Sequence, residues 1–493
     1  MYRLLEYYLI GLLLVGVGLS FFGDLNYKPV YIVTASLILV GACWGLNRIF
    51  AFLFDAPVNG ESAIITGLIL SLIITPNPTG WDFTFLLAAS GLAISSKFLI
   101  AIRRRHIFNP AAVAVVLTAL GPRQTASWWV GTAAMLPFVI LGGLLIVRKI
   151  RREVMVGAFF ASSAVATVVY SVIGHSSVTS GLQTLIFSSA MFFMGFVMLT
   201  EPVTSPPSRP NQVWYAAIVG FLLPPQVQLF NFYSSPELAL IVGNVFAYIV
   251  SPKAKLFPVL KEKVKVAANT ADFVFSSGSK FSFKPGQYME WTLPHSGADS
   301  RGARRYLTLA SSPTEKDVRI GVKFYEPGST FKKALLAMDS RTPIVASQIA
   351  GDFVLPSDRN QKLVFIAGGI GVTPFRSMIK YLIDTRDARQ VTLLYGANSL
   401  ADVAYKDIFD EAGRLIGLKT VYVLGDTSGT VPSPNIRPGM VNGEVIRAEV
   451  PDYKERMFYI SGTHHMVLAV KDALTKIGVP STHIKEDFFP GYV

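Results

Sequence analysis

The stretch KLVFIAGGIGVTPF (Lys362–Phe375) joins an apolar run to the start of a helix through a glycine-rich turn. A short apolar run bounded by turn residues is typical of a strand covered on both faces. Glycines in the turn GGIGVTP (Gly368–Pro374) let backbone amides approach a ligand, and a helix N-terminus stabilises a pyrophosphate group. The stretch therefore predicts a nucleotide-binding strand–turn–helix unit, with a tight turn that binds nothing as the alternative.

The sequence around this unit predicts two different domains. Strands alternate with helices over residues 359–493, which predicts an α/β doubly wound nucleotide-binding domain. Residues 266–358 instead carry short alternating strands, such as GQYMEWTL and VRIGVKFY, and predict a small antiparallel β-barrel. A basic, helix-poor linker at residues 253–265 precedes the barrel.

Composition changes sharply before the linker. Residues 1–252 hold only 13 of the 45 Lys and Arg residues and 8 of the 32 Asp and Glu residues. Apolar runs there predict an all-α transmembrane bundle of ten spans. The runs lie near residues 7–22, 30–46, 62–75, 81–101, 108–120, 128–147, 154–173, 182–200, 213–223 and 237–251. Residues 75–89 resemble residues 200–217, five spans later, which suggests an inverted repeat, with chance recurrence as the alternative.

Positive residues predict the orientation of this bundle. With ten spans, one face carries Arg3, Arg48, Arg103, Arg104, Arg105, Arg148, Lys149, Arg151, Arg152, Arg209, Lys253 and Lys255. The opposite face carries only Lys28 and Arg123. The positive-inside rule then predicts an integral membrane protein with both termini and the soluble domains in the cytoplasm. We expect the membrane to be the bacterial inner membrane. We assign the net charge of +13 to lipid headgroups rather than to nucleic acid.

The cysteine and histidine content limits which metal-containing cofactors the chain can bind. The only cysteine is Cys43, so the chain alone forms no disulfide, thiolate zinc site or iron–sulfur cluster, and no metal is expected. Residues 1–252 contain only His106 and His175, whereas two stacked haems need about four axial histidines. We expect His106 to be solvated beside the lipid headgroups. A haem-bearing ferric reductase or NADPH oxidase is therefore close to excluded.

Seven motifs occur in a fixed order in the second half of the chain. They are PGQY (285–288), RRYLTLASSP (304–313), PGSTFKKAL (327–335), GGIGVTP (368–374), YGA (395–397), SG (461–462) and EDFFPGY (486–492). This series resembles the ferredoxin–NADP reductase family of flavoenzymes over residues 256–493. The resemblance implies FAD and a nicotinamide dinucleotide as cofactors.

The resemblance assigns FAD contacts to two segments. These are Arg305, Tyr306, Leu307 and Thr308, and Gly328, Ser329 and Thr330. Arg305 would contact a phosphate, and Thr308 would hydrogen-bond the flavin ring near its reactive nitrogen as a catalytic residue. Leu307 stands where the family has an aromatic residue on the flavin, and Tyr306 is one place early.

The nicotinamide site is assigned in the same way. Its residues are Gly369, Gly371, Thr373 and Gly462, with Phe489 or Tyr492 beside the flavin ring. Ser461 stands where many relatives have a cysteine beside the nicotinamide, so it is the second catalytic candidate. The loop GANSLADVAY (396–405) has no Lys or Arg before Lys406, so the extra phosphate of NADPH lacks a cationic partner and NADH is predicted.

The first half has its own resemblance. FNPAAVAVVL (108–117) and SSAMFFMGFVMLTEPVTSP (188–206) resemble a family of membrane subunits found in the sodium-pumping NADH:quinone reductase and in the Rnf complex, over about residues 30–251. That family typically binds FMN through a threonine in an SGAT stretch, which this chain lacks. FMN or riboflavin held without a covalent bond is expected instead. It would lie near Asn109, Thr200 and Thr204.

Together these features predict a membrane-bound flavoprotein oxidoreductase. A hydride would pass from cytoplasmic NADH to FAD, and electrons would pass to the membrane flavin and on to a quinone, another flavin, a metal or a partner protein. A redox-coupled ion pump or solute transporter is the alternative, whose path intramembrane charges would mark. Asp55, Glu61, Asp82, Lys97 and Glu201 all lie near span ends, where solvated side chains are expected.

Overall fold

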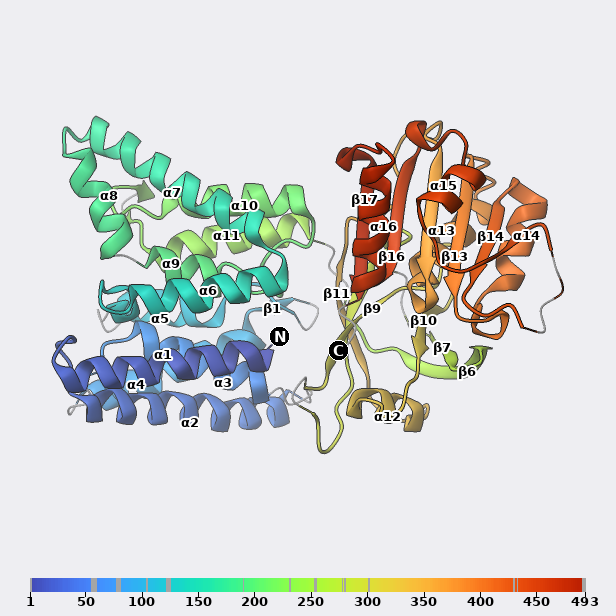
Figure 1. Cartoon of the computed structure of the whole chain (residues 1–493). Coiled ribbons are helices and arrows are strands. Elements are labelled where there is room, and N and C mark those ends of the chain that lie inside the picture. The colour runs from blue at the N-terminus through green and yellow to red at the C-terminus, as the bar shows by residue number, and fades with distance from the viewer. Residues whose placement is uncertain are drawn as a thin grey trace. The chain divides into compact units, whose positions relative to one another are not determined.

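The computed structural model describes residues 2–54, 60–76, 81–102, 105–120, 126–188, 190–229, 232–251, 255–276, 278, 281–299, 302–428, 431 and 433–489. The chain divides into two compact units. The N-terminal unit comprises residues 1–253 and 300–302, and the C-terminal unit comprises residues 254–299 and 303–493. The N-terminal unit is built mainly from helices, whereas the C-terminal unit contains three sheets (Figure 1).

Helices α1 to α11 make up the N-terminal unit. They are α1 (Tyr2–Phe22), α2 (Pro29–Leu53), α3 (Gly60–Ile73), α4 (Trp81–Leu99), α5 (Pro110–Leu120), η1 (Trp129–Gly131), α6 (Leu136–Ile150), α7 (Glu153–Ile173), α8 (Val178–Phe187), α9 (Met191–Phe193), the π-helical η2 (Met194–Met198), α10 (Arg209–Leu222) and α11 (Pro236–Val250). Two short antiparallel pairs join them, β1 (Ala101–Ile102) with β2 (Arg105–His106) and β3 (Gln228–Leu229) with β4 (Phe232–Tyr233). Helices α2, α5 and α11 begin at a proline, whose fixed φ suits the first helical position.

The ten predicted spans are not confirmed. Each predicted apolar run contains a helix, but among the described residues only α1, α2 and α7 are long and apolar enough to cross a membrane. Helix α8 and residues 191–198 make a fourth if their 57° bend is counted within one span. The run 128–147 illustrates why apolar length is a poor guide: Trp128 has a left-handed φ of 50°, and α6 does not begin until Leu136.

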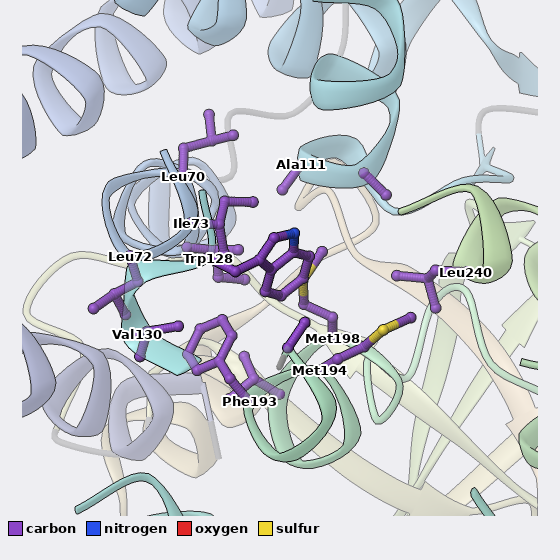
Figure 2. Packing of buried hydrophobic residues seen from close by; sticks show 14 of the residues in the cluster. Leu70, Leu72, Ile73, Ala111, Trp128, Val130, Phe193, Met194, Met198 and Leu240 are labelled. Atoms are coloured by element: carbon purple, nitrogen blue, oxygen red, sulfur yellow. The ribbon is translucent and has the colours of Figure 1, made fainter. Parts of the chain in front are cut away.

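Trp128 lies at the centre of the apolar core of the N-terminal unit (Figure 2). Side chains from several helices surround its ring, among them Ile73, Ala111, Met194, Met198 and Leu240. The backbone N–H groups of Ser127 and Trp128 both donate to the carbonyl of Ile73 at 2.9 Å, which anchors the loop to the end of α3. The indole Nε1 donates to Glu237 Oε1 at 2.6 Å, so both buried polar groups are paired.

The first part of the C-terminal unit consists of two antiparallel sheets and one helix. Its elements are β5 (Lys255–Leu256), β6 (Val259–Ala267), β7 (Thr270–Ser276), β8 (Tyr288–Thr292), β9 (Arg304–Thr308), β10 (Val318–Lys323), α12 (Thr330–Ala337) and β11 (Val345–Ala350). The strand orders are β10-β7-β6 and β5-β11-β8-β9. Phe273, Trp291 and Ile320 contribute to a buried core that both sheets share, as expected for a small barrel.

The second part contains a six-stranded, entirely parallel sheet in the order β15-β14-β13-β12-β16-β17. Its elements are β12 (Leu363–Gly368), η3 (Gly369–Val372), α13 (Thr373–Asp384), β13 (Val391–Ala397), η4 (Leu400–Asp402), α14 (Lys406–Ile416), β14 (Lys419–Leu424), β15 (Ile436–Pro438), α15 (Gly443–Glu449), η5 (Tyr453–Glu455), β16 (Met457–Thr463), α16 (His464–Lys476), η6 (Ser481–His483) and β17 (Ile484–Phe489).

Alternate residues of β12 face different helices. Phe365 packs with Phe375 of α13 and with the core that includes Phe409 of α14. Val364 belongs to a second core with Val467 of α16, on the other face of the sheet. Helices therefore cover both faces, and the predicted doubly wound arrangement is confirmed.

Candidate functional site

The parallel register brings the predicted nicotinamide residues together at the carboxyl edge of the sheet. Ala367 at the end of β12 lies opposite Ser461 of β16, and Gly368 lies opposite Gly396 of β13. Ligands of open α/β sheets bind outside this edge. The motifs GGIGVTP, YGA and SG, which are far apart in the sequence, therefore border one site.

Two glycines in the turn after β12 meet specific backbone requirements. Gly369 has a φ of +52°, a left-handed conformation that favours glycine. A Cβ on Gly371 would lie 2.4 Å from the carbonyl oxygen of Ser461 and 2.6 Å from Cα of Gly462, so a side chain there would collide with the carboxyl end of β16. Thr373 begins α13, and its hydroxyl donates to the carbonyl of Ile370 at 3.1 Å, which holds the turn closed.

Ser461 and Thr308 share an unusual property. Both side chains are buried, with exposed fractions of 0% and 4%. Among the residues that the structure describes, neither hydroxyl oxygen has a hydrogen-bond partner. A buried polar group without a partner is costly, so each of these hydroxyls is suited to a ligand that completes its hydrogen bonding.

Strand β9 carries the predicted flavin contacts on alternate faces. Leu307 packs against the barrel core, whereas Tyr306 and Thr308 share the opposite face, two residues apart. Tyr306 is 38% exposed, and its ring meets the edge of Tyr288 with the centroids 5.6 Å apart. Tyr306 is thus an aromatic residue on the face of Thr308, as is Tyr288, which pairs with Thr308 across β8 and β9.

Arg305 lies at the N-terminus of α12, beside the segment predicted to bind the pyrophosphate. Its Nη2 is 3.3 Å from Oδ1 of Asp299, and its guanidinium lies 5.1 Å from the ring centroid of Phe331. Thr330 Oγ1 accepts from the backbone N–H of Asp299 at 3.0 Å. Ser329 caps α12 by accepting from the N–H of Lys332 at 3.2 Å. The structure therefore joins the predicted phosphate residues through Asp299.

Sequence patterns did not identify two further residues beside the N-terminus of α12, Asp299 and His295. Nδ1 of His295 is 2.8 Å from the carbonyl oxygen of Leu293, and its Nε2 is 3.0 Å from Thr330 Oγ1. Both residues lie in the loop between β8 and β9, where no motif or spacing points to them. Of the two aromatic candidates at the C-terminus, Tyr492 and the side chain of Phe489 lie outside the described residues.

A third residue that sequence patterns did not identify, Asp426, follows β14 at the carboxyl edge of the parallel sheet. Its backbone N–H donates to the carbonyl of Asn398, the residue after β13, at 2.7 Å. Hydrogen bonding by Ser428 lowers the pKa of the Asp426 carboxyl, so it is ionised at neutral pH. The acidic residue that ends KTVYVLGD was the available signal, because a carboxylate beside the adenosine ribose favours NAD over NADP.

In the N-terminal unit, Asn109 and Thr204 converge on Glu201. Asn109 Nδ2 and Thr204 Oγ1 both donate to Oε2 of Glu201, at 2.9 and 3.0 Å. Asn244, which sequence analysis missed, accepts from the backbone N–H of Asn109 at 2.9 Å. Thr200 instead donates to the carbonyl of Phe196 in its own helix, so its hydroxyl is not part of this cluster.

Glu201 and His106 were expected to be solvated, and the structure corrects this. His106 Nε2 lies 3.6 Å from Oε1 of Glu201, and their side chains are only 17% and 24% exposed. The contacts of Asn109 and Thr204 account for the placement, because a carboxylate leaves water only when donors replace its hydration. Among the described residues, no three His, Cys, Asp or Glu side chains form a group that could hold a metal ion.

A cavity of about 50 Å³ adjoins this cluster. Its lining includes Ser62, Thr66, Asn109, Thr200 and Glu201. Pockets for drug-sized ligands measure roughly 300–1,000 Å³, whereas one water needs only about 10–15 Å³. The cavity therefore has room for a few water molecules, and a flavin ring would fit only if the lining side chains moved.

A comparison with known protein families matches part of the C-terminal unit. The family described as "Oxidoreductase NAD-binding domain" matches residues 365–472, which run from β12 into α16. The C-terminal part of the chain is an oxidoreductase NAD-binding domain. The prediction of an oxidoreductase is thereby confirmed for this part of the chain.

Relatives and solved structures match the same part. The propane 2-monooxygenase reductase component of Rhodococcus jostii is 31% identical over 217 residues, covering 42% of this chain and 56% of the relative. The flavohemoprotein of Bacillus cereus is 28% identical over 246 residues, covering 47% and 60%. The FAD/NAD-binding domain of nitric oxide dioxygenase from Vibrio cholerae is 21% identical with a TM-score of 0.42, covering 48% of this chain and 98% of that domain. The chain thus spans less than two thirds of the two relatives.

We expect Gly371→Ala to weaken nicotinamide dinucleotide binding by about tenfold or more, because the new Cβ forces the turn after β12 away from the carboxyl end of β16. Titration calorimetry with NADH measures the effect. Gly413→Ala on α14 is the control, since a Cβ there meets no heavy atom closer than 3.4 Å and alanine suits a helix. Equal NADH affinity in the Gly371→Ala variant and the wild type would contradict the assignment of this turn.

Proposed function

We propose that this protein is a membrane-bound flavoprotein that oxidises NADH through FAD and passes the electrons to a further acceptor. The observation that carries the proposal is a pair of buried hydroxyls, Thr308 Oγ1 on β9 and Ser461 Oγ on β16, that have no hydrogen-bond partner within the described part of the chain. The first belongs to the strand assigned to the flavin, and the second belongs to the end of the strand assigned to the nicotinamide. Each hydroxyl needs a ligand to complete its hydrogen bonding.

The residues of the C-terminal unit suit FAD. Arg305 and the N-terminus of α12 supply positive charge and backbone amides for a pyrophosphate, and Thr308 supplies a donor for the ring. Tyr306 is placed on the face of Thr308 to cover the ring. Bound FAD would accept two electrons as a hydride and release them singly, which matches relatives named as reductase components.

NADH is the proposed donor. No Lys or Arg stands in the loop after β13 before Lys406, which is itself paired with Asp410 at 2.5 Å. Asp426 adds a carboxylate at the neighbouring strand end, where it suits the ribose hydroxyls and repels an additional phosphate. Ser461 would line the nicotinamide side of the site.

For the N-terminal unit we propose the membrane role that its sequence resemblance implies. The domain boundaries at residues 252, 265 and 358, the cytoplasmic orientation and the bacterial inner membrane are part of this proposal. A non-covalent FMN or riboflavin would lie near Asn109 and Thr204, after the side chains that line the cavity have moved to admit its ring. The electrons would then continue to a quinone or another acceptor. Three helices of spanning length and the Asn109–Glu201–Thr204 cluster support this assignment.

A redox-coupled ion pump is the second candidate, favoured by one observation. The cavity beside Glu201 has room for a few water molecules rather than for a flavin ring. Lys97 also reaches this region, with Nζ 2.9 Å from Thr66 Oγ1. Sodium-dependent turnover in proteoliposomes would favour the pump, and sodium-independent turnover would favour simple electron transfer.

The first test concerns FAD. Residues 254–493 and the full chain should each bind FAD, and Arg305→Ala should raise the Kd by about tenfold to a hundredfold, because a charge-assisted hydrogen bond contributes about 1.5–3 kcal/mol. Flavin fluorescence during equilibrium dialysis measures the Kd. Arg341→Ala, in an exposed turn of the barrel, should leave the Kd unchanged. A folded wild-type fragment that binds no FAD would refute the assignment.

Cofactor preference gives the second test. Asp426→Arg should raise the ratio of kcat/KM for NADPH over NADH by about tenfold or more, since the change removes a repulsive charge and adds a phosphate partner. Steady-state kinetics with both dinucleotides measures the ratio. Asp358→Arg makes the same charge change before β12, at the opposite edge of the sheet, and should leave the ratio as it is. An unchanged ratio in the Asp426→Arg variant would place the ribose elsewhere.

The membrane flavin gives the third test. Denatured full-length protein should release two flavins per chain, and residues 254–493 should release one. Thr204→Val should lower the full-length count toward one, because the cluster around Glu201 loses a donor. Chromatography of the released flavins provides the count. One flavin in both proteins would contradict a membrane flavin.

A further inference from the structure

A buried polar contact joins the barrel to the parallel-sheet domain inside the C-terminal unit. The hydroxyl of Tyr405 donates to Oδ1 of Asp272 at 2.5 Å. Arg319 Nη1 donates to the other carboxylate oxygen at 3.0 Å. Asp272 and Arg319 belong to strands β7 and β10 of the barrel, whereas Tyr405 immediately precedes α14. Asp272 is 0% exposed and Tyr405 is 5% exposed, so water does not compete for this contact.

A glycine makes the contact sterically feasible. Gly321 of β10 lies directly opposite Asp272 of β7 in the barrel sheet. A Cβ on Gly321 would lie 2.4 Å from the Tyr405 hydroxyl, 2.8 Å from Cγ2 of Thr373 and 3.0 Å from Oδ1 of Asp272. The missing side chain therefore provides the space that the tyrosine hydroxyl occupies. It also brings that hydroxyl close to Thr373, the residue that ends the glycine-rich turn.

The backbone of Tyr405 is held in an uncommon conformation. Its φ is +61°, in the left-handed region that residues with a Cβ rarely adopt. Such conformations persist where surrounding contacts determine them, and they gather at functional sites. Burial raises the pKa of Tyr405 well above its ordinary value, so the hydroxyl keeps its proton and remains a donor.

A second set of contacts joins helix α13, which follows the glycine-rich turn, to the segment after the flavin strand β9. Arg376 in the first turn of α13 donates to the carbonyl of Ala310 at 3.0 Å and to Glu315 Oε1 at 2.9 Å. Ser377 donates to the carbonyl of Ser311 at 2.6 Å. The guanidinium of Arg376 lies 5.9 Å from the ring centroid of Tyr405. Ala310 is two residues after Thr308, so these bonds connect the flavin strand to the helix that follows the nicotinamide turn.

We propose that Tyr405, Asp272 and Gly321 form an interdomain clamp that orients the nicotinamide turn toward the flavin strand. The clamp rests on the proposed function, and its members are positioning residues, because none of them is among the residues assigned to contact either cofactor. Hydride transfer depends steeply on the distance and angle between the reacting atoms. A small rotation of the sheet domain on the barrel would therefore slow flavin reduction while leaving both binding sites intact.

The test uses the full-length protein and the Tyr405→Phe variant, which removes one oxygen and keeps the buried ring. We expect the rate constant for flavin reduction by NADH, measured by stopped flow, to fall about tenfold or more. The Kd for NADH and the FAD content should stay within about twofold of wild type. The long-wavelength charge-transfer absorbance of the reduced flavin with bound nicotinamide should weaken, which a general loss of stability would not cause.

Two further variants and a control sharpen the test. Asp272→Asn should slow flavin reduction in the same way, and Gly321→Ala should slow it more, because the new Cβ overlaps the Tyr405 hydroxyl. Tyr453→Phe is the control, since its hydroxyl bonds the carbonyl of Ile477 within the sheet domain at 3.4 Å and does not reach the barrel. Hydrogen exchange should rise in residues 270–275 and 373–384 of Tyr405→Phe but not of Tyr453→Phe.

The other possible results of these experiments would overturn either the clamp or the proposed function. Wild-type rates and wild-type charge-transfer absorbance in Tyr405→Phe would overturn the clamp and leave the proposed function standing. Loss of FAD or NADH binding in that variant, in proportion to the slower reduction, would overturn it too, because the residue would then support a binding site. Unchanged exchange in both segments would overturn it without reference to any cofactor. A wild-type protein whose flavin NADH does not reduce would instead refute the proposed function.

Discussion

The close packing of the turn after β12 against the carboxyl end of β16 is the constraint on which the site depends. Parallel pairing places Ala367 opposite Ser461, and the backbone then turns at Gly371 with no space for a side chain. This packing leaves the Ser461 hydroxyl buried at the carboxyl edge of the sheet, without a hydrogen-bond partner among the residues that the structure describes. It also fixes where α13 begins, and α13 supplies Arg376 and Ser377 to the barrel.

Local patterns predicted the elements whose signal lies within a few residues. Apolar runs with flanking turns predicted the α/β domain, because strands β12, β13, β14 and β16 are mostly apolar and mostly buried. Strand β17 carries no such signal, since Ile484–Phe489 (IKEDFF) holds three consecutive charged residues at the edge of the sheet. In the N-terminal unit, hydropathy located helices but not spans, since it does not register the π-helical turn at Met194–Met198 or the left-handed Trp128.

Residues of the candidate site that lie in recognisable motifs were predicted from the sequence. Residues that meet only through tertiary contacts were missed. Gly369, Gly371 and Ser461 stand in recognisable turns, so their meeting at one edge follows from the parallel topology. Asp272 and Tyr405 are 133 residues apart and belong to no motif. Asn109 and Asn244 are 135 residues apart. No periodicity within either segment indicates such a partner.

Both units bury a carboxylate and pair it with a donor from a distant segment. Glu237 accepts from Trp128 in the N-terminal unit, and Asp272 accepts from Tyr405 in the C-terminal unit. Apolar packing is non-directional, so by itself it tolerates small shifts of one element along another. A buried carboxyl group does not, because the loss of its donor leaves a buried polar group unpaired. That loss costs about 1–3 kcal/mol, compared with a total domain stability of about 5–15 kcal/mol. In each unit the carboxylate therefore selects one alignment from the several that the apolar surfaces would accept, and in the C-terminal unit that alignment joins the flavin strand to the nicotinamide turn.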